Sequence, residues 1–297
     1  MTVVASSIAA TGTPSVGRLL TSWQPTTAVL GGCAMAAGLY ALAIARRGRP
    51  WPARRIVAFV SGLAVVIVSL DSGVDVYSER LASLHMVQHL ALTIVAAPLL
   101  ALSAPLTLAL GATCGTTRAK LVRIIGSAPV GAISRPLSSW LLFVGVILGW
   151  HLSPLYDLSL RHPLLHEVEH LVLLTTAVLF WAQVVGADPL PHRLGAVARL
   201  LYLLAMMPAM SVIGLWLVVS RTVRYSAYLT PTRTLGLSPL RDQHIAGVIM
   251  WGGDALLGAI TLMIACGTLL HEERRAAARD AYGTRRVAPG VIGGAPR

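Results

Sequence analysis

Histidine is the residue type whose spacing in this sequence most directly suggests chemistry. His85 and His89 stand four residues apart, and so do His166 and His170. Residues four apart lie on one face of a helix, where two imidazoles can share one metal ion. Further ligands could come from a fifth histidine and from an acidic segment near the last apolar stretch. The candidate metal ligands are His85, His89, His151, His166, His170 and Asp242.

This set of side chains restricts the identity of the metal. Imidazole with carboxylate suits zinc, copper(II) or iron, whereas copper(I) prefers sulfur. The sequence holds three scattered cysteines, Cys33, Cys114 and Cys266, and none of them lies near the histidines. Neither a disulfide framework nor a cysteine metal site is therefore expected. Haem held between two histidines is also open.

The segment HEVEH at 166–170 supports a different interpretation of the histidines. It fits the pattern H-E-x-x-H, in which two histidines bind zinc and the glutamate, here Glu167, activates water. On this hypothesis the protein is an intramembrane zinc metalloprotease. The hypothesis leaves His85, His89 and His151 unexplained, because a catalytic zinc needs only one further protein ligand.

The overall composition places these residues in a membrane. Of the 297 residues, 55% are apolar and 12% are charged, against about 25% charged residues in a soluble domain. The mean hydropathy is +0.71. These values exclude an ordinary cytosolic enzyme and a disordered chain. The net charge of +12 does not indicate nucleic-acid binding, since the arginines flank apolar runs.

Seven apolar stretches predict an all-α polytopic membrane protein, a bundle of seven transmembrane helices. The predicted spans are Thr26–Ala45, Ile56–Leu70, Leu84–Leu110, Ser138–Trp150, Leu165–Val185, Val197–Ser220 and Ile245–Leu270. Pro98, Pro105 and Pro208 fall inside spans, and kinks are expected there. No signal peptide is evident, so the first span is expected to target the protein.

Arginine predicts the orientation of the bundle. Arg46 and Arg47 follow the first span, Arg118 follows the third, and more arginines lie in the tail. The positive-inside rule then puts the N-terminus outside and the C-terminus in the cytoplasm, although Arg221 and Arg224 oppose it. Seven of the nine histidines thereby fall at the outer face. The domains are an extracytoplasmic segment 1–25, the membrane domain 26–270 and a disordered basic tail 271–297.

One acidic residue is predicted to lie deep in the membrane. Asp254 stands roughly ten residues into the last span, about 15 Å from its start. A carboxylate at that depth should face the interior of the bundle. It would serve as a proton or metal relay below the histidines, or it would be a protonated acid bonded to a neighbouring helix.

Four ordered blocks between residues 60 and 265 resemble one known family. They are HMVQH at 85–89 with the prolines that follow, the segment 151–157, HEVEH at 166–170 with Phe180 and Trp181, and the segment 242–251. Together they are similar to the CtaG-type (caa-type) cytochrome c oxidase assembly factors. The chain departs from that pattern in having Ser103 near a usual glycine and Pro98 where two prolines often stand.

The resemblance implies a seven-helix membrane bundle that matures haem–copper terminal oxidases and handles copper. It implies a non-enzymatic chaperone in the plasma membrane that binds a copper ion with the histidine cluster, with zinc or haem as alternatives. Cytochrome c oxidase subunits and membrane lipid are the implied partners, nucleic acid is not, and a homo-oligomer is left open. The family also varies at Glu167, which argues against the protease hypothesis.

Overall fold

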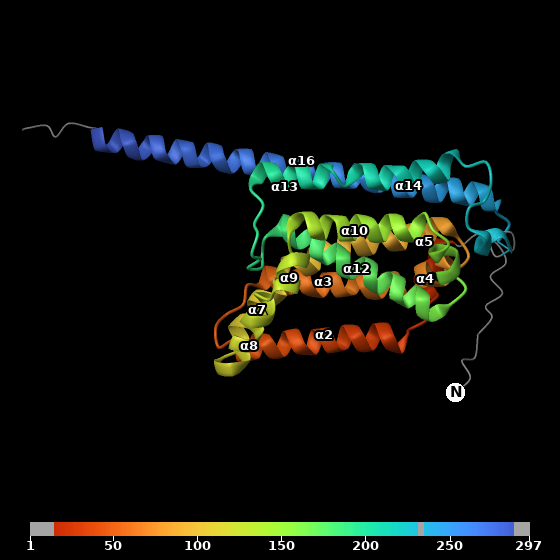
Figure 1. The fold of residues 1–297 in the computed structure, drawn as a ribbon, viewed down its shortest axis with the longest axis horizontal. Helices are drawn as coiled ribbons and strands as arrows, with labels where there is room; N and C mark the ends of the chain where they lie inside the picture. The colour runs from red at the N-terminus through yellow and green to blue at the C-terminus, as the bar shows by residue number, and fades with distance from the viewer. Residues whose placement is uncertain (1–14, 231–234, 288–297) are drawn as a thin grey trace, which may run out of the picture.

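The computed structural model describes residues 15–230 and 235–287, which form helices joined by short loops, with no strand among them. Figure 1 shows the long helices lying side by side along the longest axis of the molecule. They are α2 (Thr27–Arg46), α3 (Ala53–Asp71), the succession α5 (Ala82–Leu90), η1 (Ala91–Ala96), α6 (Ala97–Leu102) and α7 (Pro105–Ala112), then α10 (Pro136–His151), α12 (Pro163–Val185), α13 (Ala196–Leu204) with α14 (Met207–Val219), and α16 (Pro239–Val287).

Shorter helices precede or connect these long helices. They are α1 (Val16–Thr21), α4 (Gly73–Ser78), α8 (Gly115–Ile125), α9 (Ala128–Ile133), α11 (Leu155–Ser159) and η2 (Ser226–Tyr228). α8 and α9 lie in a connection for which no helix was predicted, at the end of the bundle where α2 ends (Figure 1). α4 and α11 precede α5 and α12, at the other end.

Six helices are long and apolar enough to cross a membrane within the described residues. They are Thr27–Arg46, Ala53–Asp71, Ala82–Ala112, Pro163–Val185, Ala196–Val219 and Pro239–Gly267. The seventh predicted span, Ser138–Trp150, lies within α10, an apolar helix of 16 residues. That is shorter than the 20 or so residues that a spanning helix ordinarily needs.

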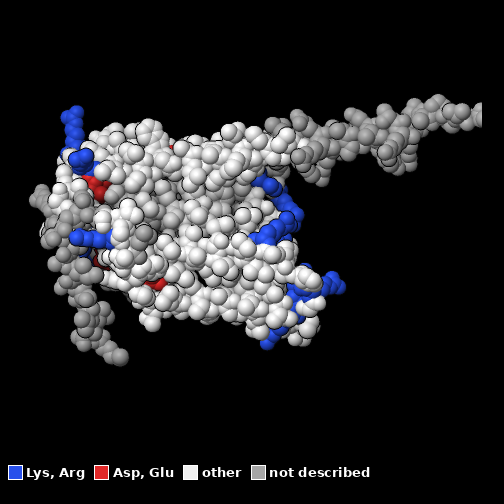
Figure 2. All heavy atoms as spheres, turned by 180° about the vertical axis from the view of Figure 1, so that it is seen from behind, with Lys and Arg blue, Asp and Glu red and all other residues white. Residues whose placement is uncertain are grey.

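The positions of the charged side chains agree with helices that span a membrane. Figure 2 shows lysine, arginine and the acidic residues toward the two ends of the visible face, with a broad uncharged band between them. Many large apolar side chains are exposed along the helices, such as Leu39, Val60, Leu171 and Leu262. A surface of that kind matches hydrocarbon rather than water.

Each predicted kink coincides with an interruption of the helix. The π-helical segment η1 ends at Ala96, two residues before Pro98, and π-helical turns insert an extra residue into an α-helix. Ala104, with φ of 52°, separates α6 from Pro105 at the start of α7. Pro208 stands at the start of α14, just after α13 ends. The proline prediction is therefore confirmed.

The tail differs from the expectation of disorder after residue 270. α16 continues as one helix to Val287, and Figure 1 shows its end projecting beyond the other helices. Residues 288–297 lie outside the described part of the chain, as do residues 1–14 of the predicted N-terminal segment. A helix can persist where a preceding helix already supplies its first turns, since only nucleation is costly.

Candidate metal centre

A cluster of four histidines and one glutamate lies where α5 and α12 begin. His85 and His89 come from α5, whereas His166, Glu169 and His170 come from α12. One ligand atom from each of His85, His89 and His170 lies within 4.8 Å of the others, and the same holds for His85, His166 and Glu169. Because the spacing of four residues puts each histidine pair on one helix face, two packed helices suffice to bring the four imidazoles together.

Most of the cluster is buried, and only His166 is partly exposed. His85 and Glu169 are 0% exposed, His89 is 2% exposed and His170 is 5% exposed. Three of its polar atoms are buried and make no hydrogen bond: Nε2 of His166, Nε2 of His170 and Oε1 of Glu169. Buried polar atoms are ordinarily paired, and an unpaired one costs free energy. Three such atoms lie together in the cluster, each without a partner among the described residues.

Glu169 supplies the carboxyl group of the cluster. Its Oε1 atom lies 3.5 Å from Nε2 of His89 and 3.9 Å from Nε2 of His85. Its Oε2 atom accepts a hydrogen bond of 2.6 Å from Ser159 in α11, which fixes the carboxylate. The indole N–H of Trp150 faces the same carboxylate without good hydrogen-bond geometry.

Hydrogen bonds outside the cluster orient His89. Nδ1 of His151 lies 2.8 Å from the carbonyl oxygen of Ile147, and a carbonyl can only accept, so this nitrogen carries the proton. The Nε2 atom of neutral His151 is then an acceptor, and Nδ1 of His89 donates to it over 3.3 Å. Neutral His89 therefore keeps a lone pair on Nε2.

A tyrosine orients His85 in the same way. The hydroxyl of Tyr228 lies 3.0 Å from the carbonyl oxygen of Ser78 and 3.1 Å from Nδ1 of His85. With its single proton donated to Ser78, Tyr228 accepts from Nδ1 of His85, whose Nε2 atom then also keeps a lone pair.

The two lone pairs face each other. Nε2 of His85 lies 2.8 Å from Nε2 of His89. Two acceptors at that distance repel each other unless a proton or a metal cation lies between them. Neutral imidazoles held by a hydrogen bond on the other ring nitrogen are the usual form of metal-ligating histidine.

Two predicted ligands lie outside this group. His151 contacts His89 but belongs to neither set of mutually close ligand atoms. Asp242, in the first turn of α16, accepts hydrogen bonds from the backbone N–H of Ala82 (2.7 Å) and from Ser83 (2.5 Å). A carboxylate there satisfies the free N–H groups at the start of α5, so it positions the helix that carries His85 and His89.

The remaining histidines with described side chains lie apart. His162 precedes α12 and is exposed, and Nε2 of His244 lies 3.0 Å from the carbonyl oxygen of Ser220. Asp254 is 3% exposed and accepts a hydrogen bond from Ser211, but its Oδ1 atom has no partner. It follows Asp242 by twelve residues, about 18 Å along the helix.

Sequence reasoning missed two contributions to the cluster. Glu169 was part of the family resemblance but was not named as a ligand; its signal was the spacing of three from His166, which turns it to the same face. Tyr228 was not singled out, and no local pattern connects it to His85, which is 143 residues away. Burial raises the pKa of Tyr228 and of Tyr156 beside it well above the ordinary value, so both phenols keep their protons.

Over the described residues the fold is all-helical, with six apolar helices of membrane-spanning length and a largely buried cluster of imidazole and carboxyl groups. Residues 38–272 match the family described as cytochrome c oxidase caa3 assembly factor (Caa3_CtaG). The chain belongs to this family, as its four sequence blocks indicated.

Three mycobacterial proteins are similar over most of the chain. An uncharacterized protein of Mycobacterium leprae is 28% identical over 280 residues, covering 90% of this chain and 42% of its own length. Uncharacterized proteins of Mycobacterium bovis and Mycobacterium tuberculosis are each 30% identical over 278 residues, with the same coverage. The chain thus spans less than half the length of these relatives. No solved structure matches it.

Proposed function

We propose that this protein binds a copper ion in the cluster and passes it to a haem–copper oxidase during assembly. Its family consists of assembly factors for cytochrome c oxidase, which implies an interaction with the oxidase complex and a non-enzymatic role. The single observation that supports copper binding is the convergence of three buried ligand atoms without partners.

The donor set fits a divalent transition metal. Nitrogen from neutral imidazoles and one carboxylate oxygen suit copper(II) or zinc, and the family context favours copper. His85, His89, His166, His170 and Glu169 would hold the ion, since their ligand atoms lie closest together. His151 would orient His89, and Asp242 would fix the start of α5. The burial of His85, His89, Glu169 and His170 would limit the access of water to the bound ion.

We also propose an orientation for the bundle. α10 would be a seventh span, because its 16 residues rise about 24 Å and polar residues flank it. The histidine end would face outward from the plasma membrane and the end near α8 would face the cytoplasm, following the positive-inside rule. The copper ion would then be taken up and released at the extracytoplasmic surface.

Two alternative functions fit the geometry less well. A protease would need Glu167 at the metal, but Glu167 is exposed while Glu169 lies against the imidazoles. A haem would need two imidazoles on opposite faces of a wide flat ring. The rings of His85 and His89 have centroids 4.3 Å apart, which favours one small ion.

Metal analysis of the detergent-purified full chain tests the proposal. After loading with copper and removal of free ion, the wild type should retain copper and show no haem absorption. His85→Ala and His170→Ala should lose more than about 100-fold in affinity, since loss of an outer-shell partner alone costs about 10–100-fold. His162→Ala is the matched control and should bind as the wild type does. Equal copper content in all four proteins would contradict the proposal.

A further inference from the structure

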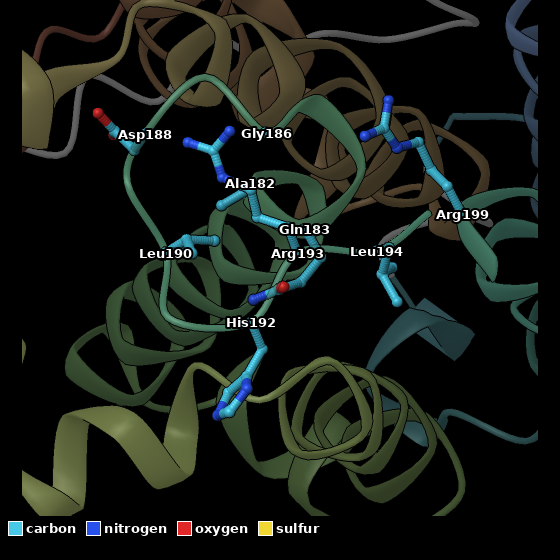
Figure 3. Close-up of a pocket in the computed structure, with 9 residues that line it drawn as sticks. All are labelled: Ala182, Gln183, Gly186, Asp188, Leu190, His192, Arg193, Leu194 and Arg199. Carbon is cyan, nitrogen blue, oxygen red and sulfur yellow. The ribbon is translucent and has the colours of Figure 1, made fainter. Parts of the chain in front are cut away.

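A cavity of about 80 Å³ lies at the end of the bundle opposite the histidine cluster. Figure 3 shows its lining, which comes from the end of α12, the connecting segment 186–195 and the start of α13. Gln183 stands thirteen residues after His170 on α12, which is about 20 Å along the helix. The cavity is therefore separate from the candidate metal centre.

The cavity is basic. Arg193 and Arg199 line it together with His192, and neither arginine forms an ion pair within the described residues. The Nε atom of Arg199 is buried and has no hydrogen-bond partner. Figure 2 shows lysine and arginine gathered around a hollow at the end of the bundle from which α16 projects.

The acidic residue of the lining does not neutralise these arginines. Asp188 accepts hydrogen bonds from the backbone N–H of Leu106 (3.2 Å) and from the N–H and hydroxyl of Thr107 (both 2.7 Å). Its charge thus satisfies the first turn of α7, where free N–H groups favour an anion. The positive charge of the two arginines remains available to a ligand.

Two further features lie beside the cavity, the start of α13 between Leu194 and Arg199, and Gln183. α13 begins at Ala196 with Gly195 as its N-cap and without a side-chain cap, so its first N–H groups have no side-chain partner. Gln183 is only 4% exposed, and its Nε2 atom donates to the carbonyl oxygen of Ser134 at 2.8 Å. Its Oε1 atom, however, is buried without a partner and can accept a further hydrogen bond.

We propose that this cavity binds a phosphate group that brings its own hydrogen-bond donor. The phosphate oxygens would accept from Arg193, Arg199 and the first N–H groups of α13, and the donor would satisfy Oε1 of Gln183. A buried water needs roughly 10–15 Å³ of such space, so the cavity is large enough for one tetrahedral anion. A phospholipid headgroup with hydroxyl groups and free hydrogen phosphate share this chemistry. The end of the span at Val185 puts the cavity at headgroup level.

Thermal unfolding of the delipidated, detergent-purified full chain tests this site, because a ligand of the folded state raises Tm with its concentration. One arm compares hydrogen phosphate with sulfate, which lacks the donor. The other arm compares short-chain phosphatidylglycerol with phosphatidylcholine, whose headgroup also lacks a donor. In one arm or both, the ligand that carries a donor should bind at least about tenfold more tightly than the ligand that lacks one. The arm that shows this preference identifies whether the phosphate comes from free hydrogen phosphate or from a lipid headgroup.

Three variants and a control complete the test. Arg193→Gln, Arg199→Gln and Gln183→Met should each raise the concentration needed for the Tm shift at least about tenfold. Arg193 is exposed, so its variant should fold even if Gln183→Met does not. Arg123→Gln, which changes an exposed arginine of α8 outside the cavity, should respond as the wild type does. No preference for the donor in either arm, or unchanged responses in both arginine variants, would overturn the proposal.

Discussion

The Oε1 atom of Glu169 lies 3.5 Å from the Nε2 atom of His89, and no donor of good geometry reaches that oxygen. This relationship distinguishes the two glutamates of the HEVEH segment. Glu169 faces the cluster, whereas Glu167, which the protease hypothesis would use, is exposed. Because both residues are glutamates, the same substitution can be made at each as a matched pair.

Glu169→Gln should weaken copper binding by at least about tenfold, because the amide keeps the shape of the side chain but removes the only carboxylate in the cluster. Glu167→Gln should leave copper affinity unchanged. Competition with a chelator of known affinity measures both. Loss of binding in Glu167→Gln with retention in Glu169→Gln would instead support the H-E-x-x-H interpretation.

Tyr228→Phe should lower copper affinity about 10–100-fold without loss of the site, since the phenol only orients His85 through Nδ1. At saturating copper the variant should still bind as much metal as the wild type. Tyr202→Phe is the matched control, because Tyr202 contacts Ser139 in another part of the bundle. Equal affinity in Tyr228→Phe and the wild type would show that Tyr228 does not position His85.

Gly247→Ala should destabilise the bundle where α14 and α16 pack most closely. A Cβ atom at Gly247 would lie 2.6 Å from the carbonyl oxygen of Gly214, so one backbone must move. Overpacking of this kind costs about 1–3 kcal/mol, which a lower Tm in detergent should show. Gly252→Ala, on the same helix, is the control, because a Cβ there would meet nothing within 4 Å. Equal Tm values for the two variants would contradict this packing.

The carboxyl group of Asp75 should make the free energy of unfolding fall as pH rises. Burial raises its pKa to about 7, with Glu79 and Asp71 adding to the effect and a hydrogen bond from Gln88 opposing it. The folded state then holds a proton that the unfolded chain loses above about 4, so stability is greatest below that pH and declines until about 7. Asp75→Asn should flatten this decline in Tm between pH 4 and 7.

Asp157 should have the opposite effect on the pH dependence of stability. Partial burial raises its pKa, but hydrogen bonds from Ala227, Ser226 and Arg161 outweigh burial and hold the pKa below its ordinary value. Its stabilisation is therefore present at neutral pH and lost as pH falls through the acid range. Asp157→Asn should leave the decline between pH 4 and 7 unchanged. A decline of equal slope in wild type and Asp75→Asn would exclude Asp75 as its cause.

The sequence by itself determined the elements and the faces that they present. Long apolar runs predict helices wherever the chain meets hydrocarbon, and the prolines at 98, 105 and 208 predict where those helices are interrupted. The spacing of His85 from His89, and of His166 from His170, predicts one face for each pair. These properties depend on residues less than one or two turns apart, which local composition and periodicity describe.

Only the tertiary structure decided which faces meet. It placed Glu169 in the cluster and Asp242 at the start of α5, although both are acidic residues near the same end of the bundle. It also brought Tyr228 to His85 across 143 residues. A helical period fixes the direction of a side chain but not its neighbour, because the rotation and register of packed helices depend on contacts along their whole length.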